Sequence, residues 1–96
     1  MYFVVCYDIQ DDKKRNKLSL LLNKYGKKVQ YSVYELTLNK TQLKSLTNAI
    51  KSQKLFSKND SIRFYHIHLD SIKKSFELSF EKKPFEEEEL SIFFED

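Results

Sequence analysis

The chain opens with an apolar run of aromatic and β-branched residues, Tyr2 to Tyr7, that ends on the carboxylate of Asp8. A strongly charged segment, residues 11–17, follows almost at once. A short apolar run bounded by polar residues is typical of a buried strand. We therefore predict a buried first strand with Asp8 at its carboxyl end, where the acid is either a helix-capping neighbour or a metal ligand.

The size and composition of the chain predict one ordered domain. Its 96 residues include eight Phe and six Tyr but only one Gly and one Pro, which argues against disorder and a loop-rich fold. A chain this short gains burial from an oligomer interface, so we expect a dimer. The lone Cys6 excludes an intrachain disulfide, and the lack of a signal sequence or membrane-length apolar stretch leads us to expect a cytoplasmic protein without membrane contact.

Charge is distributed unevenly along the sequence. Residues 1–74 contain fifteen Lys and Arg against six Asp and Glu, whereas residues 75–96 contain two against eight. A basic body can meet a polyanion such as nucleic acid, while the acidic tail meets another surface. The tail, residues 81–96, also carries apolar residues at 90–94 that need a surface, which strand addition to a neighbouring sheet edge would supply.

Hydrophobic periodicity predicts the order of the elements. Apolar residues recur at helical spacing before Gly26, so we expect a helix over residues 12–25 with Asp11 or Asp12 as its cap and Gly26 as its stop. A second helix begins at Asn39 or Thr41 and ends near Gln53. Alternation indicates strands over residues 61–69, 76–80 and 90–94.

Residues 27–38 are rich in β-formers and allow two interpretations. A corner near Tyr31 and Ser32 would give two short antiparallel strands, whereas a straight path gives one long strand. In either case the order of elements is the α+β pattern of a ferredoxin-like sandwich of the βαββαβ type over residues 1–80. Because several strands are apolar on both faces, we expect a second copy of the sheet to cover the face that the helices leave open, as a face-to-face homodimer.

Several fragments in the first 38 residues occur together in the order and spacing of a known family: Tyr7-Asp8-Ile9, residues 12–17, Tyr25-Gly26, and Val29-Gln30-Tyr31-Ser32-Val33-Tyr34-Glu35. The chain thereby resembles the Cas-two family, the smaller of the two core CRISPR adaptation proteins. The resemblance implies a ferredoxin-like homodimer, often with a C-terminal strand that crosses onto the partner's sheet. It also implies spacer acquisition beside the adaptation integrase, and metal-dependent endonuclease activity on single-stranded RNA or double-stranded DNA.

The resemblance also implies the site residues. Asp8 is the catalytic and metal-binding residue, which meets its symmetry mate at the dimer axis and binds Mg²⁺ or Mn²⁺. The expected nucleic-acid-binding residues are Lys13, Lys14, Arg15, Lys17, Lys27 and Lys28, and the expected supporting residues are Tyr7, Ser32 and Tyr34. The pair Lys27-Lys28 departs from the family, which often has an arginine there, and lysine lacks the bidentate fork of arginine.

Each of these residues also has a structural interpretation. Asp8 could cap the strand end, the cations could form a solvated helix face, and Ser32 and Tyr34 could serve an interface or aromatic packing. His66 and His68 have the spacing of a zinc pair but lack a third ligand nearby in sequence, so we expect packed or solvent-edge histidines. The rival functions are a non-catalytic scaffold that bridges integrase subunits and holds spacer DNA, a toxin-like small endoribonuclease, and a ferredoxin-like regulatory domain.

Overall fold

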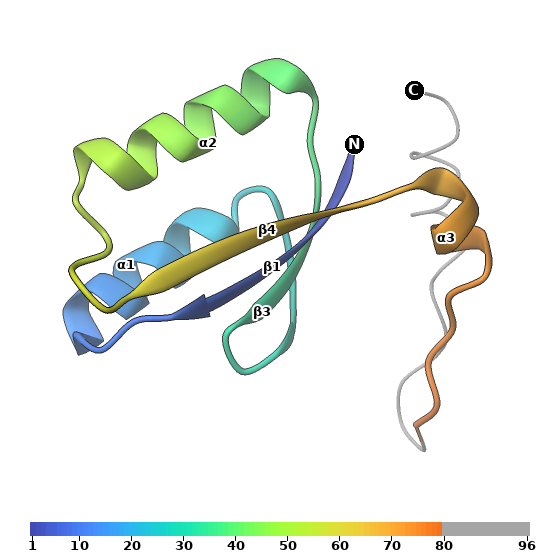
Figure 1. The fold of residues 1–96 in the computed structure, drawn as a ribbon, viewed down its shortest axis with the longest axis horizontal. Helices are drawn as coiled ribbons and strands as arrows, with labels where there is room; N and C mark the ends of the chain where they lie inside the picture. The colour runs from blue at the N-terminus through green and yellow to red at the C-terminus, as the bar shows by residue number, and fades with distance from the viewer. Residues whose placement is uncertain (80–96) are drawn as a thin grey trace.

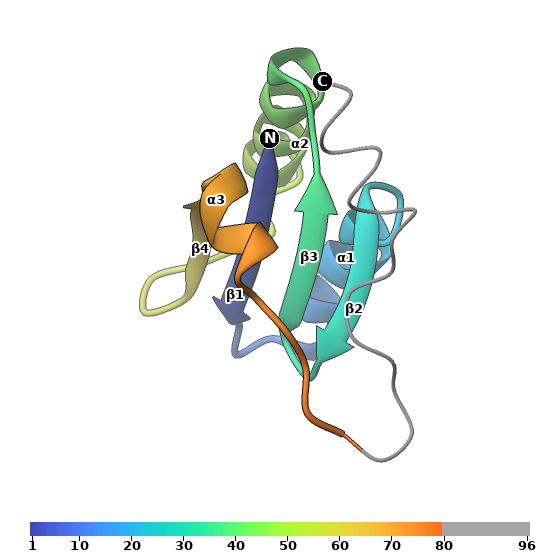
Figure 2. The same cartoon turned by 90° about the vertical axis from the view of Figure 1, so that its right-hand side faces the viewer.

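The apolar opening run forms β1 (Tyr2–Asp8), an interior strand of a four-stranded antiparallel sheet with the order β2-β3-β1-β4. This arrangement comes from a computed structural model, which describes residues 1–79. β1 pairs with β3 (Val33–Thr37) on one side and with β4 (Ser61–Ile67) on the other, while β2 (Gly26–Gln30) forms the far edge. Two helices cover one face of the sheet (Figures 1 and 2), so the predicted ferredoxin-like α+β fold is confirmed.

Both long helices begin at capping residues that the sequence identifies. In front of α1 (Asp12–Leu22), the Asp11 carboxylate accepts the Lys14 N–H at 2.9 Å. In front of α2 (Lys40–Ser52), Asn39 forms a capping box with Gln42, as one of the two predicted caps. α1 ends at Leu22 rather than at residue 25, because the chain turns at Asn23 to enter β2.

Gly26 is not the left-handed helix stop that the sequence suggests, because its φ is not positive and it begins β2. A Cβ at this position would lie 2.0 Å from the Glu35 carbonyl oxygen and 2.9 Å from the Leu36 Cα. Glycine therefore lets β2 approach β3 closely, which is a packing requirement and not a conformational one.

Residues 27–38 form a hairpin, which decides between the two interpretations of this segment. The turn lies at Tyr31 and Ser32, and Ser32 has a left-handed φ of 59°. A bulge between Lys28 and Gln30 interrupts the register of the two strands. Tyr31 lies in the turn and is exposed, whereas Tyr34 lies opposite Val5 of β1 and is fully buried.

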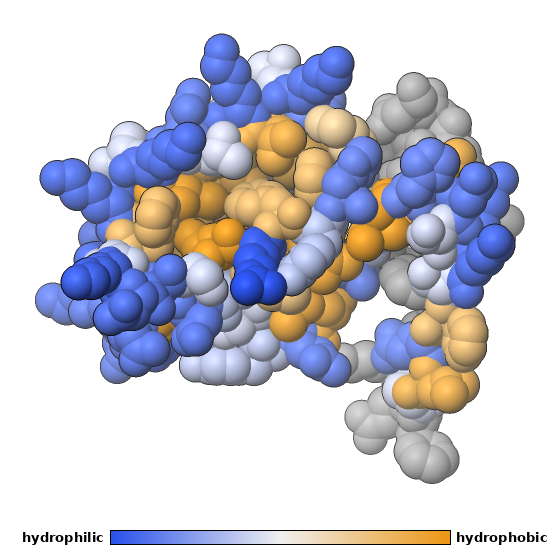
Figure 3. Space-filling model, viewed as in Figure 1, coloured by the Kyte–Doolittle hydropathy of each residue, from blue (hydrophilic) through white to orange (hydrophobic). Residues whose placement is uncertain are grey.

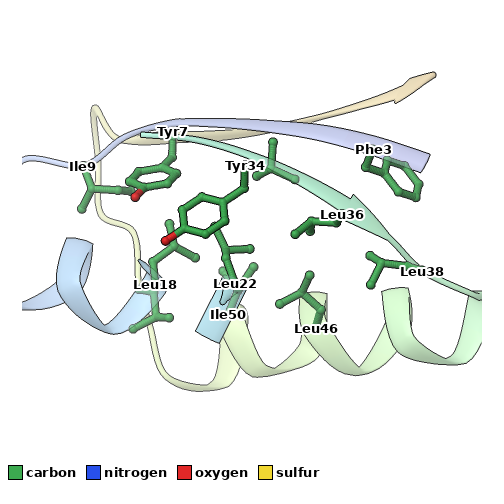
Figure 4. Packing of buried hydrophobic residues seen from close by; sticks show 12 residues of the cluster. Phe3, Tyr7, Ile9, Leu18, Leu22, Tyr34, Leu36, Leu38, Leu46 and Ile50 are labelled. Carbon is green, nitrogen blue, oxygen red and sulfur yellow. The ribbon is translucent and has the colours of Figure 1, made fainter. Parts of the chain in front are cut away.

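The core lies between the sheet and the two long helices. Phe3 and Tyr7 of β1 point to the same side as Tyr34 and Leu36 of β3, toward α1 and α2 (Figure 4), and Val5 belongs to the same buried cluster. The helices contribute the apolar stripes that their periodicity predicts, including the buried residues Leu18, Leu22, Leu46 and Ile50.

The other face of the sheet carries the alternate residues of each strand, such as Val4, Cys6 and Val33, which are half-buried. A short helix that the sequence did not predict, α3 (Leu69–Lys73), follows β4 and lies on this side (Figure 2). β4 therefore ends at Ile67, before the end of the strand predicted for residues 61–69. Ile72 of α3 is buried but does not belong to the main core cluster.

The strand predicted for residues 76–80 is wrong for its described part, since residues 76–79 form no regular structure. Phe76 and Leu78 are 70% and 87% exposed, so they do not pack onto the sheet of their own chain. Phe80, the acidic run at residues 86–89 and the strand predicted at 90–94 lie outside the described residues.

Candidate metal and nucleic-acid site

The antiparallel topology gathers the candidate residues at one end of the sheet. β1 ends there, α1 begins there, and the β2–β3 turn and the α2–β4 loop lie at the same end, the lower one in Figure 2. The Tyr7 N–H donates to the Ser32 carbonyl oxygen at 3.1 Å, which ties the hairpin turn to β1. Segments that are distant in sequence therefore meet around the carboxyl end of β1.

Asp8 is the last residue of β1, and its side chain is exposed. It lies opposite Ser61 in the ladder with β4. Because Tyr7 points into the core, alternation along the strand directs the Asp8 carboxylate to the sheet face that the long helices leave open. The acid is thus held by a strand paired on both sides, yet it remains accessible to a ligand.

The loop after Asp8 is fastened by a residue that sequence reasoning missed. The Asp60 carboxylate accepts the backbone N–H of Gln10 at 3.0 Å and that of Ser57 at 2.7 Å. These two hydrogen bonds and the nearby Lys14 ammonium hold the pKa of the Asp60 carboxyl below its usual range. Only a turn signal at residues 58–60 marked this aspartate in the sequence, and a turn signal does not reveal a partner 50 residues away.

The Arg15 guanidinium makes contacts within its own chain. Its guanidinium donates to the Ile9 carbonyl oxygen at 2.9 Å and forms an ion pair with Asp12. The hydrogen bond to Asp12 raises the pKa of the guanidinium. One function of Arg15 is therefore to hold the β1–α1 connection, in addition to any contact with a phosphate.

The other predicted cations differ in their solvent exposure and in their side-chain contacts. Lys13 and Lys17 are exposed on α1, whereas Lys14 is half-buried and donates to the Ser57 hydroxyl. Lys27 and Lys28 are exposed on β2, and the Lys28 ammonium lies 5.5 Å from the centre of the Tyr31 ring. Further exposed lysines that the sequence analysis did not single out lie at the end of α2 and in the loop after it: Lys51, Lys54 and Lys58.

The predicted supporting residues are mainly structural. The Tyr7 and Tyr34 rings stack with their centres 6.3 Å apart, and the Tyr34 hydroxyl lies 2.6 Å from that of Ser19. Burial raises the pKa of the Tyr7 phenol, against the opposing effect of the Ser19 and Ser32 hydroxyls. Tyr7 therefore stays protonated at neutral pH, and both tyrosines belong to the core cluster.

The two histidines have separate environments. The His66 ring lies 5.1 Å from the Phe3 ring, and the His68 Nδ1 accepts the Asp70 N–H at the start of α3. No group of three or more His, Cys, Asp or Glu side chains that could hold a metal ion occurs among residues 1–79. The expectation of packed or solvent-edge histidines agrees with these contacts.

An apolar groove of about 320 Å³ lies between α2 and β4. Figure 3 shows apolar side chains gathered there with hydrophilic ones around them; Ile50, Phe56, Ile62 and Phe64 are among the lining residues. One side of the groove is β4, an edge strand that in the described part of the chain pairs only with β1. An edge of this kind can accept a further strand.

Comparison with known proteins decides the family. The model of the family described as CRISPR associated protein Cas2 matches residues 1–75. The chain belongs to the Cas2 family. The resemblance seen in the sequence is thereby confirmed.

Relatives and solved structures of the Cas2 family agree with this assignment. The CRISPR-associated endoribonuclease Cas2 3 of Synechocystis sp. is 45% identical over 64 residues, which are 66% of this chain and 67% of that protein. The crystal structure of Streptococcus pyogenes Cas2 is 25% identical, with a TM-score of 0.69, and the match covers 82% of this chain and all of that one. A chain of a partial Cas6-RT-Cas1–Cas2 complex is 41% identical, with a TM-score of 0.62 and coverage of 80% and 89%.

The Asp8 site can be tested for its fit to the divalent ion that the Cas2 family implies. A hard cation such as Mg²⁺ prefers oxygen ligands and keeps several waters, so that one or two carboxylates are enough. Asp8 offers one exposed carboxylate on the open face of the sheet, and a second copy would bring another. The donor chemistry of this carboxylate therefore fits a hard divalent cation.

The described residues also bear on membrane association. None of their helices combines the length and the apolar character that a bilayer-spanning helix needs.

Proposed function

We propose that this chain is a CRISPR adaptation protein that acts as a homodimeric, divalent-metal-dependent endonuclease in the cytoplasm. The observation that carries the proposal is the placement of Asp8: an exposed carboxylate at the end of a rigid interior strand, next to a helix that begins with exposed cations. Relatives in the same family are named CRISPR-associated endoribonucleases or endonucleases. The candidate substrates are single-stranded RNA and double-stranded DNA.

The homodimer is supported by surfaces that one chain leaves incompletely buried. Half-buried Val4, Cys6 and Val33 lie on the open face of the sheet, and exposed Phe76 and Leu78 belong to the segment that follows α3. A second sheet packed on this face would bury them and bring the two Asp8 carboxylates toward a shared axis.

In the proposed mechanism the residues of the chain have distinct tasks. Exposed Lys13 and Lys17 bind phosphates and keep the nucleic acid against the start of α1. The Asp8 carboxylates would hold Mg²⁺ or Mn²⁺, and the chemistry that such an ion would supply is activation of water and stabilisation of charge on the scissile phosphate. Arg15 holds the β1–α1 connection through the Ile9 carbonyl, so that the lysines and the acid keep their relative positions.

The C-terminal segment has a candidate surface of its own. An exchanged strand from the partner chain would complete the open edge of β4, and apolar side chains next to it would enter the groove between α2 and β4. Exposed Lys51, Lys54 and Lys58 near this groove suit the acidic character of residues 81–96. The adaptation integrase is the second candidate for the segment.

A cleavage assay tests the enzymatic proposal. The wild-type dimer should cut RNA or DNA only with Mg²⁺ or Mn²⁺, and both Asp8→Asn and Asp8→Ala should abolish cleavage while the dimer stays folded. Asp70→Asn, the same change at an exposed aspartate of α3, is the control and should cut normally. Full activity in repurified Asp8→Ala protein would refute the assignment.

The scaffold is the second candidate function, and the solved partial Cas6-RT-Cas1–Cas2 complex favours it because it contains Cas2 in an assembly with Cas1. A spacer-acquisition assay separates the two functions. Acquisition that persists in Asp8→Ala would show that the chain serves as a bridge for integrase and DNA without catalysis.

A further inference from the structure

Asp60 joins two loops that are far apart in sequence. Its Oδ1 accepts the Gln10 N–H at 3.0 Å, and its Oδ2 accepts the Ser57 N–H at 2.7 Å. One carboxylate thus joins the α2–β4 loop, which contains Asp60 and Ser57, to the β1–α1 connection. Gln10 and Asp60 are 50 positions apart in sequence. Charge-assisted hydrogen bonds of this kind are stronger than neutral ones and restrict both segments.

These hydrogen bonds lie immediately beyond the end of the β1–β4 ladder. The last register pair is Asp8 with Ser61; Gln10 is two residues after Asp8, and Asp60 directly precedes Ser61. The carboxylate therefore continues the connection between the two strands where backbone pairing stops. A strand end without such a connection would fray.

Lys14 strengthens the same junction from α1. Its ammonium donates to the Ser57 hydroxyl, and it lies close enough to Asp60 to attract that carboxylate. The start of α1, the loop at Ser57 and the residues after Asp8 are therefore held as one unit.

We propose that Asp60 is a positioning residue that fixes the backbone carrying Asp8. The consequence for metal binding rests on the proposed function, because it takes Asp8 as the metal-binding acid. Two Asp8 carboxylates from separate chains can share one ion only if each is held in a defined place before the ion arrives. Support of a ligand by neighbouring hydrogen bonds changes metal affinity by roughly 10- to 100-fold in other metal sites.

The test compares Asp60→Ala and Asp60→Asn with the wild-type dimer. Asparagine keeps one oxygen acceptor, so it should have an intermediate effect. Asp11→Asn is the matched control: it removes one negative charge from the β1–α1 connection that Asp60 contacts, but asparagine caps a helix as well as aspartate does. Native-state amide exchange should show that Gln10 loses protection in Asp60→Ala, and Mn²⁺ titration followed by electron paramagnetic resonance should show about 10-fold weaker binding.

The outcomes distinguish this inference from the proposed function. If Asp8→Ala binds as much Mn²⁺ as the wild-type protein, the metal assignment fails. Amide exchange at Gln10 alone then decides the role of Asp60. Unchanged protection of Gln10 in Asp60→Ala would overturn the inference. So would full Mn²⁺ affinity in a variant that has lost this protection, because the fixed backbone would then be irrelevant to the ion. Should Asp60→Ala fail to fold, the same comparisons are made with Asp60→Asn.

Discussion

The hydroxyl groups of Tyr34 and Ser19 lie 2.6 Å apart and join β3 to α1 inside the core. Tyr34 also donates to the Ser19 carbonyl oxygen at 3.3 Å. The aromatic ring is fully buried, so this polar contact satisfies a phenol that would otherwise be costly to remove from water. The pair therefore accommodates the phenol of Tyr34 inside the core between β3 and α1.

Tyr34→Phe should destabilise the fold by about 1 kcal/mol and leave cleavage unchanged, because it removes a structural hydrogen bond and keeps the ring. Urea denaturation measures the stability. Tyr31→Phe, at a ring that is 74% exposed, is the control and should change stability far less. Loss of cleavage in a Tyr34→Phe protein of normal stability would instead place this hydroxyl in the reaction.

Gly26→Ala should destabilise the protein by about 1–3 kcal/mol, because the new Cβ would collide with the backbone of β3 and force β2 away. Ser32→Gly is an informative companion, since glycine accepts the left-handed φ of that turn residue without strain. The second variant should be at least as stable as the wild type. Thermal melting of both variants checks the pair, and an unaffected Gly26→Ala protein would contradict the close approach of the strands.

The contribution of Asp60 to stability should depend on pH. The ionised carboxylate accepts the Gln10 and Ser57 N–H groups, which lowers its pKa in the folded state. The stabilisation is therefore complete above the pKa of an unfolded aspartate, about 3.9, and is lost as the pH falls through the lower folded value. Melting curves of wild type and Asp60→Asn should differ at neutral pH and converge in acid; a difference that persists in strong acid would exclude this origin.

Removal of the exposed cations of α1 should weaken nucleic-acid binding and make the affinity less dependent on salt concentration. Lys13→Ala and Lys17→Ala should each lower the slope of log affinity against log salt by about 1, because each removes one phosphate contact. Lys40→Ala, at the start of α2 and thus at the opposite end of the sheet, is the control. Fluorescence anisotropy at several salt concentrations measures the slopes, and equal slopes for all four proteins would remove α1 from the binding surface.

The local pattern of the sequence determined much of the fold. The apolar run before Asp8 predicted β1, and helical spacing predicted α1 and α2, each with two candidate caps from which the structure selects Asp11 and Asn39. These signals act between residues a few positions apart, and the structure preserves them because the core uses the same apolar faces. The position of Asp8 at the end of a strand follows from the same local information.

Only the tertiary structure decided how distant segments meet. The register of β3 against β1 determined that Tyr34 faces the core, because it lies directly opposite the buried Val5 and opposed residues of paired strands point to the same side of the sheet. The need for glycine at residue 26 arises from the backbone of β3, and the role of Asp60 arises from an N–H group on the loop after β1. Such contacts depend on how completed elements pack against each other, so no pattern of neighbouring residues contains them.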